Sequence, residues 1–186
     1  MDFHIRTNLN NKIGIGHLSR SLRLANKIVE NGHNCNIYVD NFKNNFFYQN
    51  KKINFFSLYK KENYNSEKKD SLLFIRETQS KPGIVIIDDY RLTQIWEKEI
   101  YKFHKKIIVL EDLNINKHYA DIIINFSPNF LDGSKYNYKL SKKKNCRFLL
   151  GPKYSLINRE YKKQNSKKFN IVFYNGGSGD LNFLKK

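Results

Sequence analysis

The chain has 186 residues, a hydrophobic content of 40% and a formal net charge of +17. This is enough apolar material for one domain with a buried core, or for one domain with a piece of a second. No apolar run reaches the roughly 18 residues that a membrane-spanning helix requires, and Met1 leads into a predicted strand without a signal-peptide pattern. The sequence therefore predicts a cytoplasmic protein that is not inserted into a membrane.

The positive charge is spread along the chain instead of being concentrated on one element. Local lysine clusters fall at residues 142–144, 162–163 and 167–168, in predicted loops. No zinc-finger, RNA-recognition or helix-turn-helix signature accompanies them. We therefore expect these lysines to lie on solvated loops, and we do not expect a nucleic-acid partner.

The two cysteines, Cys35 and Cys146, are far apart in the sequence and show neither metal-ligand nor CxxC spacing. We interpret them as reduced thiols of a cytoplasmic protein. No metal site is predicted, and no metal or redox cofactor is expected.

A glycine-containing loop separates the first predicted strand, residues 2–7, from the clearest amphipathic helix of the chain. The loop carries Gly14 and Gly16, His17 stands at the helix start, and Gly32 is placed to end the helix. The apolar positions of the helix recur at helical spacing, at Leu18, Leu22, Ala25, Ile28 and Val29. Glycines let a backbone approach a phosphorylated ligand, and the free N–H groups of a first helical turn favour an anion. The pattern is therefore compatible with a phosphate-binding loop.

The same pattern has a structural interpretation. A strand, a Gly-x-Gly loop and a helix occur in many α/β domains without a ligand, and Ser19 stands where the dinucleotide fingerprint has its third glycine. His17 could equally bond to backbone at the helix start. The other histidines, His4, His33, His104 and His118, are interpreted as surface or structural residues.

Strands and helices alternate through the rest of the chain. Further strands are predicted at residues 35–40, 53–58, 83–90, 106–110, 120–126 and 148–150. Helices are predicted at residues 71–79 and 93–105, with a short helix within 41–50 and a polar, exposed stretch at 60–69. This alternation predicts an α/β fold, a Rossmann-like doubly wound parallel sheet.

The run 83–90 is apolar without alternation, which is typical of a strand buried on both faces of a parallel sheet. It ends in Asp88, Asp89 and Tyr90, at the edge where open α/β sheets bind ligands. Tyr90 could position a substrate or cap the strand end as a half-buried aromatic. Asp88, and Asp112 after the next strand, could contact a ligand or receive backbone N–H bonds. Arg6 could pair with such a carboxylate or with the substrate.

The last part of the chain repeats the opening pattern. Residues 161–168 are polar and predict a linker, residues 169–174 predict a new strand, and Gly176, Gly177 and Ser178 follow it. We therefore expect one Rossmann-like N-terminal domain at 1–160, a linker at 161–168, and at 169–186 the first strand and glycine loop of a truncated C-terminal nucleotide-binding domain.

Several separated motifs occur together in a characteristic order. They are Ile5-Arg6, the loop 13–17 with Arg20, and the segments 87–91 (IDDYR), 111–113 (EDL), 118–121 (HYAD), 150–160 (LGPKYSLINRE) and 176–178 (GGS). With this set the chain resembles the N-terminal half of the UDP-2,4-diacetamido-2,4,6-trideoxy-β-L-altropyranose hydrolases of pseudaminic acid biosynthesis. The resemblance extends over essentially all 186 residues.

The resemblance implies the N-terminal domain of a GT-B-like two-domain architecture, with the sugar nucleotide between the domains and most nucleotide contacts in the C-terminal one. It implies that His17 is the general base for a water that attacks the anomeric carbon and releases UDP with inversion. The positive end of the helix dipole disfavours imidazolium there and so keeps the base neutral. The substrate-binding residues it implies are Gly14, Gly16, Arg6, Arg20, Asp88, Tyr90, Asn158, Gly176, Gly177 and Ser178.

Two other functions remain open from the sequence. The chain could be the acceptor-side half of a GT-B glycosyltransferase, which UDP release to water without an acceptor would exclude. It could also be a non-catalytic truncated domain that self-associates through an unpaired strand at 169–174. The expected partners are accordingly a UDP-sugar and either a second copy of the chain or a separate C-terminal half.

Overall fold

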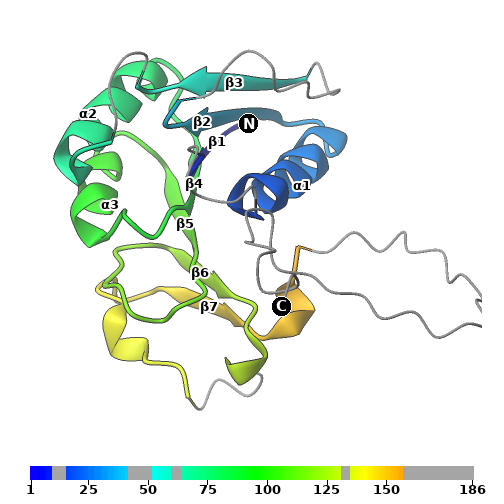
Figure 1. The fold of residues 1–186 in the computed structure, drawn as a ribbon, viewed down its shortest axis with the longest axis vertical. Coiled ribbons are helices and arrows are strands. Elements are labelled where there is room, and N and C mark those ends of the chain that lie inside the picture. Colours follow the sequence, from blue (N-terminus) through cyan, green and yellow to red (C-terminus); the bar gives the residue numbers. More distant parts are fainter. Residues whose placement is uncertain (10–15, 42–51, 60–63, 131–134, 157–186) are drawn as a thin grey trace, which may run out of the picture.

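The computed structural model describes residues 1–9, 16–41, 52–59, 64–130 and 135–156. Seven strands form one parallel sheet in the order β3-β2-β1-β4-β5-β6-β7 (Figure 1). The strands are β1 (Asp2–Thr7), β2 (Asn34–Val39), β3 (Ile53–Ser57), β4 (Ile84–Asp88), β5 (Lys106–Leu110), β6 (Ile122–Asn125) and β7 (Arg147–Leu150). The helices of the described part are α1 (Gly16–Glu30), α2 (Glu67–Thr78) and α3 (Gln94–Ile100), with short 3-10 turns η1 (Pro128–Phe130), η2 (Tyr138–Leu140) and η3 (Pro152–Tyr154).

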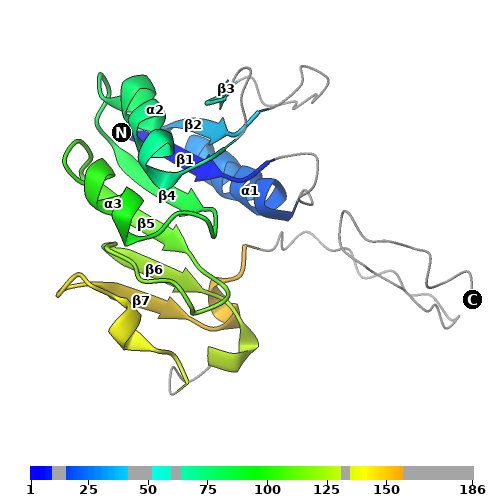
Figure 2. The same ribbon diagram turned by 60° about the vertical axis from the view of Figure 1, so that its left-hand side comes forward.

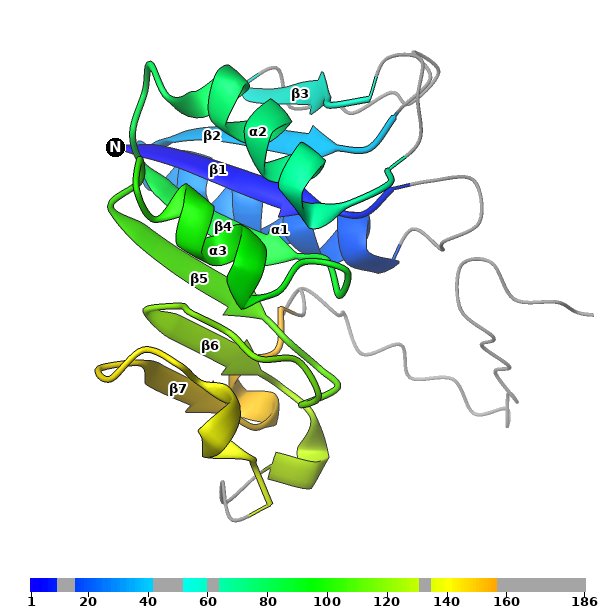
Figure 3. The same cartoon turned by 90° about the vertical axis from the view of Figure 1, so that its left-hand side faces the viewer.

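The helices cover both faces of the sheet. Figure 2 shows α1 on one face and α2 with α3 on the other, and Figure 3 views the sheet with α2 and α3 in front. The core on the α1 side joins Leu18, Ala25 and Ile28 of the helix to strand residues such as Ile5 and Ile86. The core on the other side packs Phe74, Trp96 and Ile100 against Val85, Ile107 and Ile123. The predicted α/β, Rossmann-like parallel sheet is confirmed.

The central strands pack closely enough to require a glycine before β4. Val85, Ile86 and Ile87 are at most 2% exposed, as expected for a strand covered on both faces. A Cβ on Gly83 would lie 2.1 Å from the carbonyl oxygen of Asp2 at the start of β1. Only glycine therefore lets these two neighbouring strands approach as they do.

The end of α1 follows the sequence prediction. Gly32 adopts φ +81°, in the left-handed region that favours glycine. Its N–H bonds to the carbonyl of Val29 at 3.0 Å, and the N–H of His33 bonds to Ile28 at 3.2 Å. This pair of bonds is the Schellman ending, which turns the chain from α1 directly into β2.

Two predicted helix boundaries are wrong. α2 begins at Glu67, inside the stretch expected to be exposed and polar, because the Ser66 hydroxyl accepts the N–H of Lys69 at 3.3 Å and caps the helix. α3 ends at Ile100 instead of residue 105. The His104 side chain is buried, and the N–H of Lys105, just before β5, bonds to the carbonyl of Gly83, just before β4.

Other predictions fall outside the described residues. They are the loop 10–15, the short helix within 41–50, and everything after residue 156, including the linker at 161–168 and the strand at 169–174. The domain division at residue 160 therefore stays a prediction. None of the described helices is long and apolar enough to cross a membrane.

Candidate functional site

A cluster of polar side chains gathers where the central strands end. All strands of a parallel sheet end at one edge, and the crossover from β1 brings the first turn of α1 to that same edge. His17 and Arg20 come from that first turn, Asp88 is the last residue of β4, and Tyr90 follows it. Asp112 comes from the segment after β5. The fold thus brings together four of the residues expected at the site, His17, Arg20, Asp88 and Tyr90.

His17 and Asp88 form the centre of the cluster. Nδ1 of His17 lies 2.6 Å from Oδ1 of Asp88, and the Asp88 side chain is fully buried while 17% of the His17 side chain is exposed. Because a carboxylate only accepts hydrogen bonds, Nδ1 carries a proton, and in the neutral ring the lone pair is then on Nε2. Among the described residues, no hydrogen bond to Nε2 is found, so this atom can accept a proton from a ligand or from water.

Arg20 binds the same carboxylate with two nitrogens. Its Nε donates to Oδ2 of Asp88 at 2.6 Å and its Nη2 contacts Oδ1. Burial alone would raise the pKa of Asp88, but the hydrogen bonds from Arg20 and His17 outweigh burial and hold that pKa below its ordinary value. Asp88 is therefore an anion at neutral pH.

Asp112 links Arg20 to Tyr90. Its Oδ2 accepts from Nη1 of Arg20 at 2.5 Å and from the hydroxyl of Tyr90 at 2.6 Å. The Tyr90 ring stands edge-on to the His17 ring, with centroids 4.7 Å apart. Burial, together with the Asp112 carboxylate, raises the pKa of Tyr90, so its hydroxyl stays protonated. The contacts close a ring that passes through His17, Asp88, Arg20, Asp112 and Tyr90.

The cluster carries one net negative charge when His17 is neutral, because two carboxylates face one guanidinium. Two nearby oxygens, Oδ1 of Asp112 and the hydroxyl of Thr7, are buried and have no hydrogen-bond partner among the described residues. Thr7 is paired in register with Asp88, so the two lie side by side at the end of their strands. This edge of the sheet thus offers acceptors for a hydroxyl or amide group.

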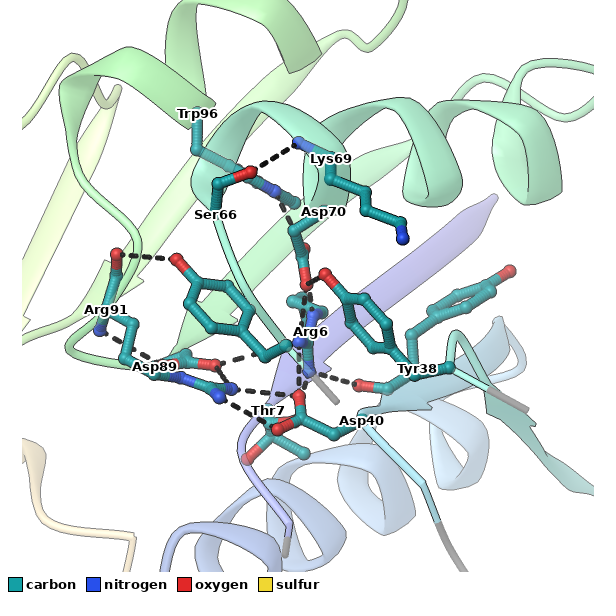
Figure 4. A network of polar contacts seen from close by, with 12 residues as sticks. Arg6, Thr7, Tyr38, Asp40, Ser66, Lys69, Asp70, Asp89, Arg91 and Trp96 are labelled. Carbon is teal, nitrogen blue, oxygen red and sulfur yellow. Dashed lines mark hydrogen bonds and ion pairs between the residues drawn. The ribbon is translucent and has the colours of Figure 1, made fainter. Parts of the chain in front are cut away.

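Arg6 lies on the other face of the sheet and its donors are all used inside the protein. It is fully buried, and Nε and Nη2 bind the two oxygens of Asp70 at 3.1 and 2.7 Å (Figure 4). Nη2 also binds Asp40 at 2.5 Å, and Nη1 donates to the carbonyl of Thr7 at 2.7 Å. No donor is left for a substrate, so we assign Arg6 to the support of the sheet edge. This is the carboxylate pairing that the sequence left open.

Arg91 completes this second network. It binds Asp89 and Asp40, and its guanidinium carbon lies 4.1 Å from the centre of the Tyr64 ring. Figure 4 shows Arg6 and Arg91 converging on Asp40 and Asp89 from opposite sides. We name the group Arg6, Asp40, Asp70, Asp89 and Arg91 the buried network, and the group His17, Arg20, Asp88, Tyr90 and Asp112 the histidine network.

The structure places the remaining predicted residues as follows. Gly16 is the first residue of α1, and no described atom lies within 4 Å of the position that a Cβ would take there. Gly14, Asn158, Gly176, Gly177 and Ser178 lie outside the described residues. The sequence left Asp112 open as a ligand contact or a backbone-bonded strand-end carboxylate and did not place it among the substrate-binding residues; its position after a buried strand was the signal for the site.

The other histidines that the structure describes inside the fold are structural, as expected. His4, His104 and His118 are at most 6% exposed and bond to neighbouring groups of the chain. Within the described ranges, no group of three or more His, Cys, Asp or Glu side chains is arranged to hold a metal ion.

Comparison with known proteins gives one distant relative to report. No family model matches the chain. An uncharacterized protein of Methanocaldococcus jannaschii, MJ1062, is 29% identical in an alignment 186 positions long. The alignment covers 94% of this chain and 36% of the relative. The chain therefore spans little more than a third of the length of the relative it matches.

Proposed function

We propose that this chain carries the catalytic base of a nucleotide-sugar hydrolase, which releases UDP from a UDP-2,4-diacetamido-2,4,6-trideoxy sugar in pseudaminic acid biosynthesis. The observation that carries the proposal is the bond between His17 and Asp88. These residues are 71 positions apart, and each belongs to a motif on which the family resemblance rests. Their contact supports a histidine whose Nδ1 is fixed and whose Nε2 is available.

The histidine network suits a water as the nucleophile. Nε2 of His17 takes a proton from water while the water oxygen bonds to the anomeric carbon. The bond from that carbon to the UDP oxygen breaks, and UDP leaves from the opposite face, so the configuration is inverted. Asp88 holds the ring through Nδ1 and stabilises the imidazolium that forms, and the proton then passes to solvent.

The charge of the network indicates which part of the substrate it holds. Positive charge develops at the anomeric carbon as UDP leaves, and a cluster with one excess negative charge stabilises it. A diphosphate would be repelled by Asp88 and Asp112. We therefore assign the glycosyl group to the histidine network and the diphosphate to other residues, in the glycine loop and in a C-terminal nucleotide-binding domain.

The experiment measures UDP release from the altrose-configured sugar nucleotide, without an acceptor. It uses the 186-residue chain and a version extended by the C-terminal domain of a hydrolase of the resembled family. We expect release that is lost in His17→Ala and retained in His33→Ala, since His33 follows the far end of α1. Release that needs an added sugar acceptor would indicate a glycosyltransferase, and release unchanged in His17→Ala would contradict the proposal.

A further inference from the structure

The guanidinium of Arg20 lies directly beside the His17 ring, which must be neutral to act as a base. Its Nη2 is 3.1 Å from Nδ1 of His17, one helical turn away, while the same guanidinium holds both oxygens of Asp88. With Nδ1 protonated toward Asp88, both nitrogens are donors and do not bond to each other. The Arg20 side chain is 13% exposed, so water screens its charge only partly.

Without Arg20, the charge of Asp88 would favour the protonated form of His17, which cannot act as a base. A carboxylate 2.6 Å from Nδ1 stabilises the protonated ring, and an imidazolium has no lone pair with which to take a proton from water. The positive charge of Arg20 lies beside the ring and offsets the charge of Asp88. It therefore favours the neutral ring, while Asp88 still fixes the tautomer.

We propose that Arg20 is a positioning residue that keeps His17 neutral, with its proton on Nδ1 and its lone pair on Nε2. This role replaces the substrate contact expected for Arg20 from the family resemblance. Asp112 holds Arg20 in place by accepting from Nη1 at 2.5 Å, and Phe126 lies under the guanidinium at 5.3 Å. The role of the ring as a base rests on the proposed function, but its ionisation state does not.

The groups that face His17 set the direction of the expected changes. Among the described residues they are Asp88 from β4, Arg20 from α1 and Tyr90 from the segment after β4, with Asp112 bound to Arg20 and Tyr90. The Tyr90 hydroxyl stays neutral, so Arg20 and Asp88 are the charges next to the ring. Removing the guanidinium and removing the carboxylate must therefore shift the protonation of His17 in opposite directions.

The test is a pH titration of the imidazole nitrogens by NMR on protein labelled with ¹⁵N in histidine, with His17→Ala to assign the signal. We expect the Nδ1–H tautomer in the unmodified chain. In Arg20→Gln the midpoint of His17 protonation should rise by about one pH unit or more, and in Asp88→Asn it should fall. Arg20→Lys, which keeps the charge, should stay closer to the unmodified chain, and Arg23→Gln, on the exposed side of the same helix, should not shift it.

An unchanged midpoint in Arg20→Gln would overturn the proposal, and so would equal shifts in Arg20→Gln and Arg20→Lys. The titration needs no turnover, so it tests the role of Arg20 even in a chain that does not hydrolyse the substrate. Absence of hydrolysis would count against the proposed function alone. With turnover, the acid limb of kcat/KM should move by the same amount as the NMR midpoint, at unchanged KM for the UDP-sugar. A higher KM without a moved limb would show that Arg20 contacts the substrate.

Discussion

The two charged networks at the carboxyl edge of the sheet are built from similar residues but differ in what they leave open. The buried network surrounds a fully buried Arg6, and each of its guanidinium nitrogens is bonded to Asp70, Asp40 or a main-chain carbonyl. In the histidine network, Oδ1 of Asp112 is buried and has no hydrogen-bond partner among the described residues, and the bonds described for His17 all involve Nδ1. An arginine with all its donors satisfied supports structure, whereas a network with open acceptors is suited to a ligand.

The alternation of side chains along a strand explains why the two networks are separate. Arg6 and Thr7 are neighbours on β1 and must point to opposite faces of the sheet. Arg6 therefore meets Asp70 of α2, while Thr7 stands next to Asp88 and the start of α1. One step along β1 thus separates the face with the buried network from the face with the histidine network.

The largest effect is expected from the buried network. Arg6→Gln would leave Asp70 and Asp40 with fewer counter-charges in a dry site, so we expect the free energy of unfolding to fall by about 3–5 kcal/mol. Chemical denaturation would measure this, with Arg23→Gln as an exposed control that should change stability by less than about 0.5 kcal/mol. A loss of similar size in both variants would remove the contrast between the two networks.

The next effect concerns the rate of UDP release. Asp88→Asn keeps the size of the side chain but removes the charge that fixes Nδ1 of His17, and we expect kcat to fall by about 10²–10⁴-fold. The folded state should survive, because Arg20 keeps its bond to Asp112. A kcat within a few-fold of the unmodified chain would show that Asp88 does not orient the histidine.

His104, whose ring centroid lies 5.4 Å from that of His4 on the face of the buried network, provides a separate pH reference. Burial lowers the pKa of His104 from 6.5 to about 4, and its Nδ1 accepts the N–H of Gly83 at 3.3 Å. The unfolded chain therefore binds a proton between these pH values that the folded protein excludes. The stability that comes from neutral His104 should be fully present above about pH 6.5, and the free energy of unfolding should decline as the pH falls toward 4.

Denaturation curves at several pH values would measure that decline, and His104→Gln should make it shallower in this range, leaving the part due to His4, whose pKa burial also lowers. Below pH 4 a further loss should remain in the variant, because Asp40 and Asp88 have pKa values held below 3.8 by their arginine partners against the opposing effect of burial. An unchanged slope in His104→Gln between pH 6.5 and 4 would assign the acid sensitivity to other groups.

The smallest effect is expected from Tyr90→Phe. The variant keeps the ring against His17 and loses the hydroxyl bond to Asp112, while Asp112 still holds Arg20. We expect kcat to fall by less than about tenfold, or less than about 1.4 kcal/mol in the activation free energy, because the lost bond does not involve His17. A loss as large as that of His17→Ala, in the same UDP-release assay, would give the hydroxyl a direct part in the reaction.

The sequence predicted what depends on local pattern. The bounds of β1, the glycine that ends α1 and the continuous apolar run of β4 follow from periodicity and from the conformations that glycine allows. A parallel sheet then requires His17 and Asp88 to be near one edge, because each follows or ends a strand. This part of the candidate site was accessible without coordinates.

The rest depends on contacts between distant segments. The pairing of Arg6 with Asp70 spans 64 positions and requires the packing of α2 on the sheet, which no periodicity predicts. The sharing of Asp88 between His17 and Arg20 likewise appears only when α1 is docked. Sequence reasoning named Arg20 as a site residue but could not distinguish a ligand contact from a contact that acts through its neighbour.

The most direct test of the account is the fate of solvent oxygen during UDP release. In water enriched in ¹⁸O, attack at the anomeric carbon places the label in the released sugar and leaves UDP unlabelled, and His17→Ala should form neither product at a measurable rate. Mass spectrometry of both products would decide this. Label in UDP would mean attack at phosphorus, and labelled sugar from His17→Ala would mean that another group activates the water; either result would contradict the account.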